Sequence, residues 1–250
     1  MLHPDFLTRP LAHRGLHKAG VPENSIAAFR AAVERGYGIE LDVQPAADGT
    51  PLVFHDADLV RMTGIDRPVA ALSVAEAAAQ DLLKTGQTIP TLRQVLEMVG
   101  GRVPVLVEVK DQDGRLGPGM GDLPARVAEV VRSWAVREQP VAVMSFNPHA
   151  VRMMHEAEPA LACGLTSCGF AADHWGRVPE ERRAALARLE NFDTVGAGFI
   201  SHDHHDLTNP AVRRLAGRGV PVLCWTIRSA AQEAAARRIA RNITFEGYLP

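Results

Sequence analysis

The chain has 250 residues, of which 46% are hydrophobic and 22% are charged, and its formal net charge is -2 at pH 7. This length and composition are typical of a globular protein with one large core, and no linker or shift in composition divides the chain. The balanced charge, without a stripe of Lys or Arg, argues against a surface for nucleic acid or for an anionic membrane.

The three cysteines, Cys163, Cys168 and Cys224, have neither the spacing of a metal site nor the even number of a disulfide framework. The first ten residues lack the basic and apolar regions of a secretory signal, and no apolar run reaches the length of a membrane span. We therefore expect a cytoplasmic protein in a reducing compartment, without a stable membrane association.

The first third of the chain predicts a parallel strand–helix–strand unit. The opening segment ends in Leu11-Ala12-His13-Arg14-Gly15, a short apolar approach to a polar stop at a glycine, which predicts a strand followed by a loop. Asn24 and Ser25 are both good N-cap residues for a helix over Ile26–Arg35. The next stretch, Gly38–Gln44, alternates apolar and polar residues as a strand does.

Turn and capping signals define the elements that follow. Asp48-Gly49 is a turn signal, and the apolar run Pro51–Asp56 predicts a hairpin arm beside the second strand. Two capping boxes, Ser73 with Glu76 and Thr91 with Gln94, predict helices over Ser73–Lys84 and Thr91–Val99.

The rest of the chain alternates regularly between strand and helix patterns. The nearly continuous apolar run Val103–Lys110 predicts a strand that is buried on both faces. Further strands are predicted over Pro140–Phe146, Leu161–Thr166, Thr194–Ile200, Val220–Ile227 and Asn242–Glu246. Helices are predicted over Leu123–Arg137, Pro148–Glu158, Glu180–Leu189, Pro210–Arg218 and Ala230–Ile239. Eight parallel strands with helices between them predict an α/β fold, a closed (β/α)8 TIM barrel. An open doubly wound sheet is the alternative, but no glycine-rich phosphate fingerprint follows the first strand.

Three acidic side chains stand out on two of these strands. Glu40 and Asp42 are two residues apart on one strand, so both leave the same face. Two like charges side by side favour a cation between them, although an exposed, solvated strand face would also accept them. Glu108 near the end of the next barrel strand supplies a third hard oxygen ligand, as Mg²⁺ or Ca²⁺ prefers.

Histidines and cations gather at the same ends of the predicted strands. His13 and His55 can act as general acid and base near neutral pH. Arg14 and Lys110 can bind an anion and balance the acids. In a barrel, functional residues lie at the C-terminal ends of the strands, so these groups together predict a metal-assisted site for phosphoryl transfer at a phosphodiester.

The motifs that carry this chemistry resemble those of the glycerophosphodiester phosphodiesterase family, in the same order and over nearly the whole chain. They are His13-Arg14-Gly15, Pro22-Glu23-Asn24-Ser25, Glu40-Leu41-Asp42-Val43, Val53-Phe54-His55-Asp56, Glu108-Val109-Lys110 and Trp225-Thr226. The resemblance implies a single TIM-barrel domain over 1–250 with a small insertion, at about 58–91, between the second and third barrel strands.

The resemblance also implies an activity and a set of site residues. It implies a hydrolase of lipid and glycerol metabolism that cleaves small-molecule glycerophosphodiesters to glycerol 3-phosphate and an alcohol. One divalent cation, Mg²⁺ or Ca²⁺ with Mn²⁺ as an alternative, is implied at Glu40, Asp42 and Glu108. The implied acid/base pair is His13 and His55, and the implied substrate-binding residues are Arg14, Lys110, Glu23 and Trp225.

Two departures from the family pattern lie after the last two strands. Ile227-Arg228 follows the tryptophan and threonine where the family commonly has a small apolar residue and asparagine. Thr244-Phe245-Glu246-Gly247 stands where the family commonly has Thr-Asp-x-Pro. These changes bear on the alcohol that is released more than on the phosphodiester chemistry.

Several alternatives stay open at this point. The chain is alternatively a lysophospholipase D-like or phospholipase C-like phosphodiesterase, or an inactive barrel that binds a phosphorylated ligand. Either histidine can be the acid, and either water or the glycerol 2-hydroxyl can attack. The histidine-rich segment 201–206 is interpreted as a loop that lines the pocket rather than as a second metal site.

Overall fold

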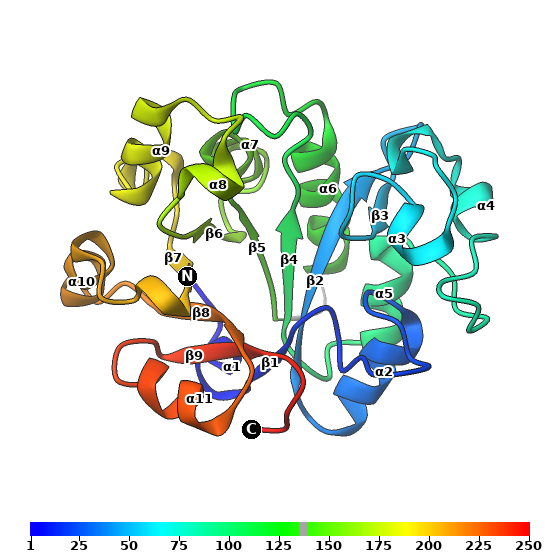
Figure 1. Ribbon diagram of the computed structural model, residues 1–250, viewed down its shortest axis with the longest axis horizontal. Coiled ribbons are helices and arrows are strands. Elements are labelled where there is room, and N and C mark those ends of the chain that lie inside the picture. The colour runs from blue at the N-terminus through cyan, green and yellow to red at the C-terminus, as the bar shows by residue number, and fades with distance from the viewer. Residues whose placement is uncertain (136–139) are drawn as a thin grey trace.

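The computed structural model describes residues 1–135 and 140–250 of the chain. Eight parallel strands form a closed barrel, as the sequence predicts, because β1 pairs with both β2 and β9. The barrel strands are β1 (Leu11–Ala12), β2 (Gly38–Pro45), β4 (Val105–Val109), β5 (Val141–Ser145), β6 (Ala162–Ser167), β7 (Phe199–Asp203), β8 (Val222–Ile227) and β9 (Asn242–Phe245). They form the centre of the molecule in Figure 1.

Helices follow most of the strands and cover the outside of the barrel. The α-helices are α1 (Asp5–Thr8), α2 (Ile26–Glu34), α3 (Val60–Thr63), α4 (Val74–Ala77), α5 (Leu92–Val99), α6 (Leu123–Ala135), α7 (Pro148–Ala157), α8 (Ala172–Trp175), α9 (Glu180–Ala187), α10 (Pro210–Gly217) and α11 (Ala230–Ala236). Single 3-10 turns are η1 (Val69–Ala71), η2 (Asp193–Val195) and η3 (His204–Asp206). The last two residues of the helix predicted over Leu123–Arg137 lie outside the described residues.

Side chains alternate along β2 and β4, so that one face of each strand packs in the main core and the other face carries the acidic residues. Val105, Val107 and Val109 of β4 pack in the core between strands and helices, whereas Leu106 packs in a second cluster with Phe199. Glu108 follows Leu106 on the same face, because strand side chains alternate with a period of two. The same alternation on β2 places the apolar residues in the main core and the two acids on the opposite face.

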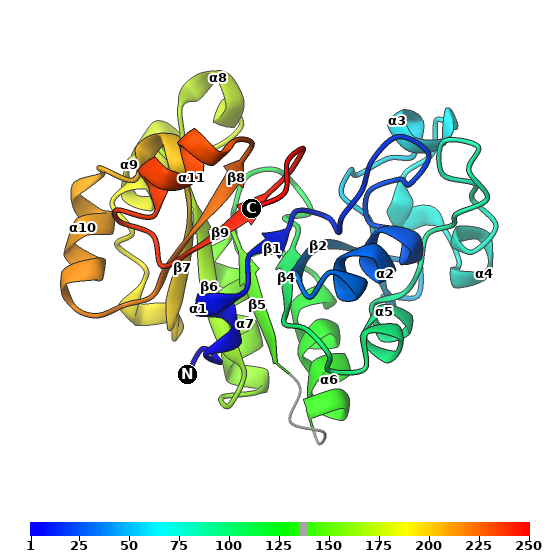
Figure 2. The ribbon, with the colours of Figure 1, turned by 90° about the horizontal axis from the view of Figure 1, so that it is seen from below.

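The segment between β2 and α5 forms a small cluster of its own. Strand β3 (Pro51–Val53) runs antiparallel to the end of β2, which confirms the predicted hairpin. The helices α3 and α4 follow it, and the cluster is built from Ala46, Leu52, Phe54, Leu59, Met62, Val69, Leu72, Ala77, Leu82 and Ile89. From here on we use the word insertion for residues 46–89, the range that this cluster spans, which overlaps the segment expected at about 58–91. In Figures 1 and 2 its helices lie at one side of the barrel, beside α5 and opposite α10.

The two predicted elements whose extent differs most from the structure are a helix and a strand. The helix predicted over Ser73–Lys84 is only α4, because the backbone N–H groups of Ala79 and Gln80 bond three residues back and close the helix, after which Leu82 pairs with Gln87. The strand predicted over Thr194–Ile200 begins only at Phe199 and continues to Asp203. Gly196 takes φ 73° here, and a Cβ at this position would lie 2.2 Å from the ring of His155, so this glycine forms a tight turn against α7.

No helix in the described part of the chain is long and apolar enough to cross a membrane.

Candidate active site

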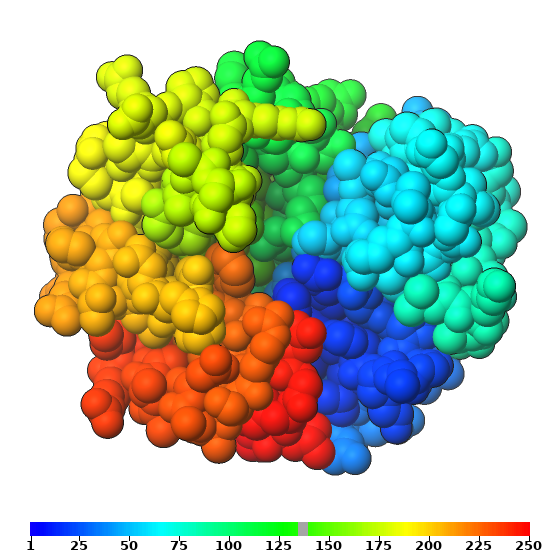
Figure 3. Space-filling view, viewed as in Figure 1, coloured from blue at the N-terminus to red at the C-terminus, as the bar shows by residue number. Residues whose placement is uncertain are grey.

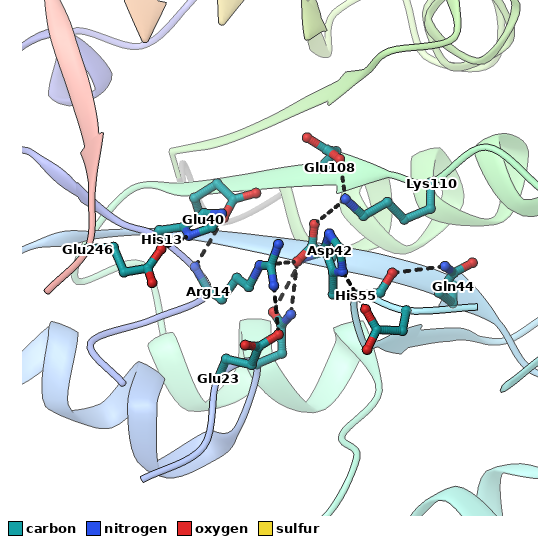
Figure 4. Close-up of polar contacts among 12 residues, drawn as sticks. His13, Arg14, Glu23, Glu40, Asp42, Gln44, His55, Glu108, Lys110 and Glu246 are labelled. Carbon is teal, nitrogen blue, oxygen red and sulfur yellow. Dashed lines mark hydrogen bonds and ion pairs between the residues drawn. The ribbon is translucent and has the colours of Figure 1, made fainter. Parts of the chain in front are cut away.

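Three buried carboxylates meet at the C-terminal ends of β2 and β4. Glu40, Asp42 and Glu108 are 3%, 2% and 5% exposed, and one oxygen of each lies within 4.8 Å of the others. The parallel register pairs Asp42 directly with Glu108, which brings the third acid to the first two. Figure 4 shows the three side chains beside one another, with the histidines on either side.

Two cations and an amide hold Asp42 in its ionised form. Lys110 Nζ lies 2.7 Å from Asp42 Oδ1 and also contacts Glu108 Oε1, while Arg14 Nε lies 3.3 Å from Asp42 Oδ2. Asn24 Nδ2 donates to Asp42 Oδ2 at 2.9 Å. Burial alone would raise the pKa of Asp42, but Lys110, His55 and Arg14 outweigh it and the pKa is lowered.

Glu40 is compensated less completely than Asp42. The backbone N–H of Arg14 donates to Glu40 Oε2 at 3.1 Å. Burial, and then repulsion from Asp42 and Glu108, raise the pKa of Glu40 well above its ordinary value. Hard oxygen donors that repel one another in a buried place are the donor set that Mg²⁺ or Ca²⁺ binds, so this acidic cluster fits a divalent cation.

The backbone around Arg14 explains the His-Arg-Gly motif. Arg14 and Gly15 both have positive φ, 54° and 81°, so the chain turns sharply after β1. A Cβ on Gly15 would lie 2.9 Å from Ala28 and Phe29 of α2, so only glycine fits. This close approach aims the backbone N–H of Arg14 at Glu40.

The segment before α2 serves both the helix and the site. Ser25 is the N-cap, because its side chain accepts a hydrogen bond from the backbone N–H of Ala28. Asn24 instead has φ 53° and turns inward, where its side chain bonds both the carboxylate and the backbone N–H of Asp42.

Each of the two histidines is held by a carboxylate. His13 Nδ1 lies 2.8 Å from Glu246 Oε2, and His55 Nδ1 lies 2.7 Å from Asp56 Oδ1. Hydrogen bonding to His13 lowers the pKa of Glu246 to about 2. Burial would raise the pKa of Asp56, but hydrogen bonds from His55 and Arg61 lower it to about 2. An ionised carboxylate can only accept, so Nδ1 carries the proton on both rings and Nε2 is left to interact with a ligand.

The side chain of Glu23 lies behind Arg14. Arg14 Nη1 donates to Glu23 Oε1 at 2.8 Å, and Arg61 of α3 binds the same carboxylate through both Nη atoms, at 3.0 and 2.7 Å. Burial would raise the pKa of Glu23, but the two arginines lower it. Glu23 therefore positions Arg14 from the edge of the site, where the sequence places it.

A cavity of about 90 Å³ joins these groups. It is lined by His13, Arg14, Glu40, Asp42, His55, Glu108, Lys110, Met144, Phe146, Trp225 and Thr244. Within the described part of the chain the buried hydroxyl of Thr244 has no hydrogen-bond partner, so a polar ligand group would satisfy it. Figure 3 shows a hollow on this face, where the N-terminal, central and C-terminal segments meet.

An aromatic cluster forms the wall of the cavity opposite the insertion. The rings of Trp225 and Phe146 pack edge to face with centroids 5.7 Å apart, and Phe170 and Trp175 extend the cluster. Trp225 Nε1 donates to the backbone oxygen of Ser201 at 3.1 Å, which fixes the ring. Trp225 is thus both packed and in contact with the cavity.

The histidine-rich segment 201–206 differs from the loop that the sequence predicts. Residues 201–203 belong to β7, and His202 is fully buried between Ser167, at 2.7 Å, and Asp206, at 3.2 Å. Only η3 follows the strand, and the rings of His204 and His205 stack there at 3.7 Å. His202 is therefore a hydrogen-bonded core residue.

Sequence reasoning missed two supporting residues. Glu246 reaches His13 because barrel closure places β9 beside β1, and its position directly after the last strand was the available signal. Arg61 lies in the insertion, where no motif marks it. All nine predicted site residues nevertheless lie at the cavity or, for Glu23, directly behind it.

Comparisons with known proteins agree with this geometry. Residues 13–243 match the model of the glycerophosphoryl diester phosphodiesterase family. A glycerophosphodiester phosphodiesterase of Caldanaerobacter subterraneus is 36% identical over 172 residues, covering 65% of this chain and 68% of the relative. One of Bacillus subtilis is 27% identical over 92% of this chain and 80% of the relative.

Solved structures share the fold. A phosphodiesterase of Oleispira antarctica in complex with the product sn-glycerol-3-phosphate superposes with a TM-score of 0.76 at 23% identity, over 96% of this chain and 93% of that one. A glycerophosphodiester phosphodiesterase of Thermotoga maritima gives 0.68 at 22% identity, over 94% and 92%. The chain belongs to the glycerophosphoryl diester phosphodiesterase family and is a phosphodiester hydrolase.

Proposed function

We propose that this enzyme hydrolyses glycerophosphodiesters to glycerol 3-phosphate and an alcohol, with one divalent cation, Mg²⁺ or Ca²⁺, held by Glu40, Asp42 and Glu108. The observation that carries the proposal is the pairing of this buried acidic cluster with two carboxylate-bound histidines around one cavity. The Oleispira antarctica relative holds glycerol 3-phosphate as its product, which supports the same product here.

The residues of the chain divide the chemistry among them. Arg14 and Lys110 place positive charge at the cavity, where they bind the phosphodiester. When bound, the cation supplies Lewis-acid polarisation of a phosphoryl oxygen. Thr244 offers a further hydroxyl to the phosphodiester. The ring of Trp225 also lines the cavity, where it can cover the carbon atoms of the substrate.

The histidines transfer the protons. Burial lowers the pKa of His13, although its bond to Glu246 opposes the shift, and the neutral ring is the form that accepts a proton. We therefore assign His13 as the base that takes the proton of the attacking hydroxyl, from water or from the glycerol 2-position, and His55 as the acid that protonates the departing alcohol. Attack by the 2-hydroxyl gives a cyclic phosphate, which water then opens to glycerol 3-phosphate. On both rings the Nδ1–H remains hydrogen-bonded to its carboxylate, Glu246 or Asp56, so both proton transfers use Nε2.

The test measures release of glycerol 3-phosphate from glycerophosphocholine and glycerophosphoethanolamine, in EDTA and then with Mg²⁺, Ca²⁺ or Mn²⁺ restored. Metal-dependent release by the wild type is expected, with losses of about 10²–10⁴-fold in His13→Ala. Glu40→Gln should lose the response to metal. His3→Ala and Glu97→Gln change exposed residues outside the cavity and are the controls.

Two results would contradict the proposal. Phosphodiester binding without turnover under any metal would indicate an inactive binding barrel. Turnover of a lysophospholipid, without turnover of the glycerophosphodiesters, would show that the substrate is a lipid instead.

A further inference from the structure

We propose that Arg61 is a positioning residue through which the insertion couples the phosphate-binding Arg14 to the acid/base residue His55. The inference rests on the proposed function for the roles of Arg14 and His55. Its geometry does not depend on that function, because it consists of contacts between side chains.

Arg61 binds two carboxylates at once. Its Nη1 and Nη2 donate to Glu23 Oε2 and Oε1 at 3.0 and 2.7 Å, and its Nε donates to Asp56 Oδ2 at 2.7 Å. The planar guanidinium can make this three-bond contact, whereas the single ammonium of a lysine cannot reach both partners in the same geometry.

Each of these carboxylates has its second contact inside the site. Glu23 Oε1 also accepts from Arg14 Nη1 at 2.8 Å. Asp56 Oδ1 lies 2.7 Å from His55 Nδ1. Arg14 and His55 both line the cavity, so one surface arginine is connected to two different functions of the site.

The insertion holds Arg61 in place for this role. Arg61 lies on α3, and its neighbour Met62 is buried in the core of the insertion with Leu59. The side chain of Arg61 is 47% exposed, so its ion pairs contribute little to global stability. An effect of Arg61 on turnover would therefore come from orientation rather than from loss of the fold.

The two connections predict two separable kinetic effects. Releasing Glu23 frees Arg14, which weakens substrate binding and raises KM. Releasing Asp56 frees the ring of His55, which lowers kcat. Loss of supporting contacts of this kind typically lowers activity about 10–100-fold. Arg61→Ala should therefore lower kcat/KM by that amount, partly through a lower kcat and partly through a higher KM.

The experiment combines Arg61→Ala with Glu23→Gln and with Asp56→Asn. In the Glu23→Gln background, Arg61→Ala should still lower kcat but leave KM unchanged. In the Asp56→Asn background it should still raise KM but leave kcat unchanged. Arg61→Lys should resemble Arg61→Ala although it keeps the charge. Arg67→Ala, in the same insertion but paired with Glu76, is the control and should resemble the wild type.

Equal loss in all three backgrounds would overturn the coupling and leave only a structural effect, as would full activity in Arg61→Lys. A readout without turnover separates this result from failure of the proposed function. The ¹⁵N spectrum of the imidazoles should show the Nδ1–H tautomer of His55 in the wild type and Arg67→Ala, and tautomer averaging in Arg61→Ala. An unchanged His55 tautomer in Arg61→Ala would overturn the proposal even if no substrate is turned over.

Discussion

Glu246 departs from the family pattern and still contacts a histidine of the candidate site. The family commonly places an aspartate directly after the threonine, and this chain has Phe245 there, buried against the ring of Tyr37. The longer acid at the next position reaches His13, and Arg228 Nη2 binds the same oxygen of Glu246 at 3.1 Å. The two residues that depart from the family pattern, Arg228 after β8 and Glu246 after β9, therefore contact each other, and Glu246 holds His13.

Replacing Glu246 should slow the chemical step. In Glu246→Gln the amide keeps the shape but loses the charge that fixes the His13 tautomer, so we expect kcat to fall about 10–100-fold with little change in KM. Steady-state kinetics on glycerophosphocholine measure the two constants. Glu190→Gln removes an exposed ion pair with Arg188 outside the cavity and is the control. A wild-type kcat in Glu246→Gln would contradict the role.

The same residue predicts a dependence of stability on pH. The pKa of Glu246 is about 2 in the folded protein and has an ordinary value of 4.5. A lowered pKa means that the unfolded chain binds the proton more tightly, so the stabilisation is present above pH 4.5 and is lost as the pH falls through about 2. Urea unfolding in EDTA should therefore show that the free energy of unfolding of the wild type exceeds that of Glu246→Gln above pH 4.5. This difference should shrink as the pH falls from 4.5 toward about 2. A constant difference would contradict the shift.

At the scale of elements, patterns predicted the barrel strands well and the insertion poorly. The alternation in β2 and the continuous apolar run in β4 are periodic, and burial follows from them directly. The insertion is made of four-residue helices and turns that are stabilised by their own small core. Elements this short do not show a helical or strand periodicity in the sequence. For this reason the sequence indicated a capping box at Ser73 but not where the helix ends.

The core of the insertion should control activity at a distance. Leu82 is 1% exposed in this core, whereas its neighbour Leu83 is 54% exposed. Leu82→Ala should cost about 2–5 kcal/mol of local stability, because a buried leucine leaves a cavity. The opened insertion would release Arg61, so hydrogen exchange should increase in residues 46–89 and kcat/KM should fall.

Leu83→Ala is the matched control for this prediction, since it removes the same atoms from the surface one position away. It should leave both hydrogen exchange and turnover close to wild type. Increased exchange in Leu82→Ala with unchanged kcat/KM would show that the insertion does not support the site.

At the scale of the whole molecule, the site exists because the barrel closes. His13 and Glu246 are 233 positions apart, and they meet only because β1 pairs with β9. The motifs at the strand ends allowed the sequence to predict which residues gather, since the eight barrel strands all run parallel. The residues that support this site could not be predicted. Arg61 and Glu23, for example, lie on segments that no strand pairing or sequence pattern connects, so their contact depends on how the side chains are placed.

A bound divalent cation should stabilise the barrel. Glu40, Asp42 and Glu108 are buried together, and the raised pKa of Glu40 reflects the cost of ionising it there. A bound cation would remove that cost, and at a hundred times its Kd it stabilises by about 2.7 kcal/mol, which corresponds to a rise in Tm of about 5–10 °C for a chain of this size. Glu40→Gln removes one of the repelling charges, so in EDTA its Tm should exceed that of the wild type.

Adding Mg²⁺ or Ca²⁺ should reverse this order, because the wild type gains the cation and the variant does not. Thermal unfolding with and without metal measures the crossover, and Glu97→Gln, exposed on α5, should follow the wild type in both conditions. If Glu40→Gln were less stable than the wild type in EDTA, the carboxylates would not repel one another as their burial implies. If both proteins gained equally from metal, the cation would bind elsewhere than at this acidic cluster.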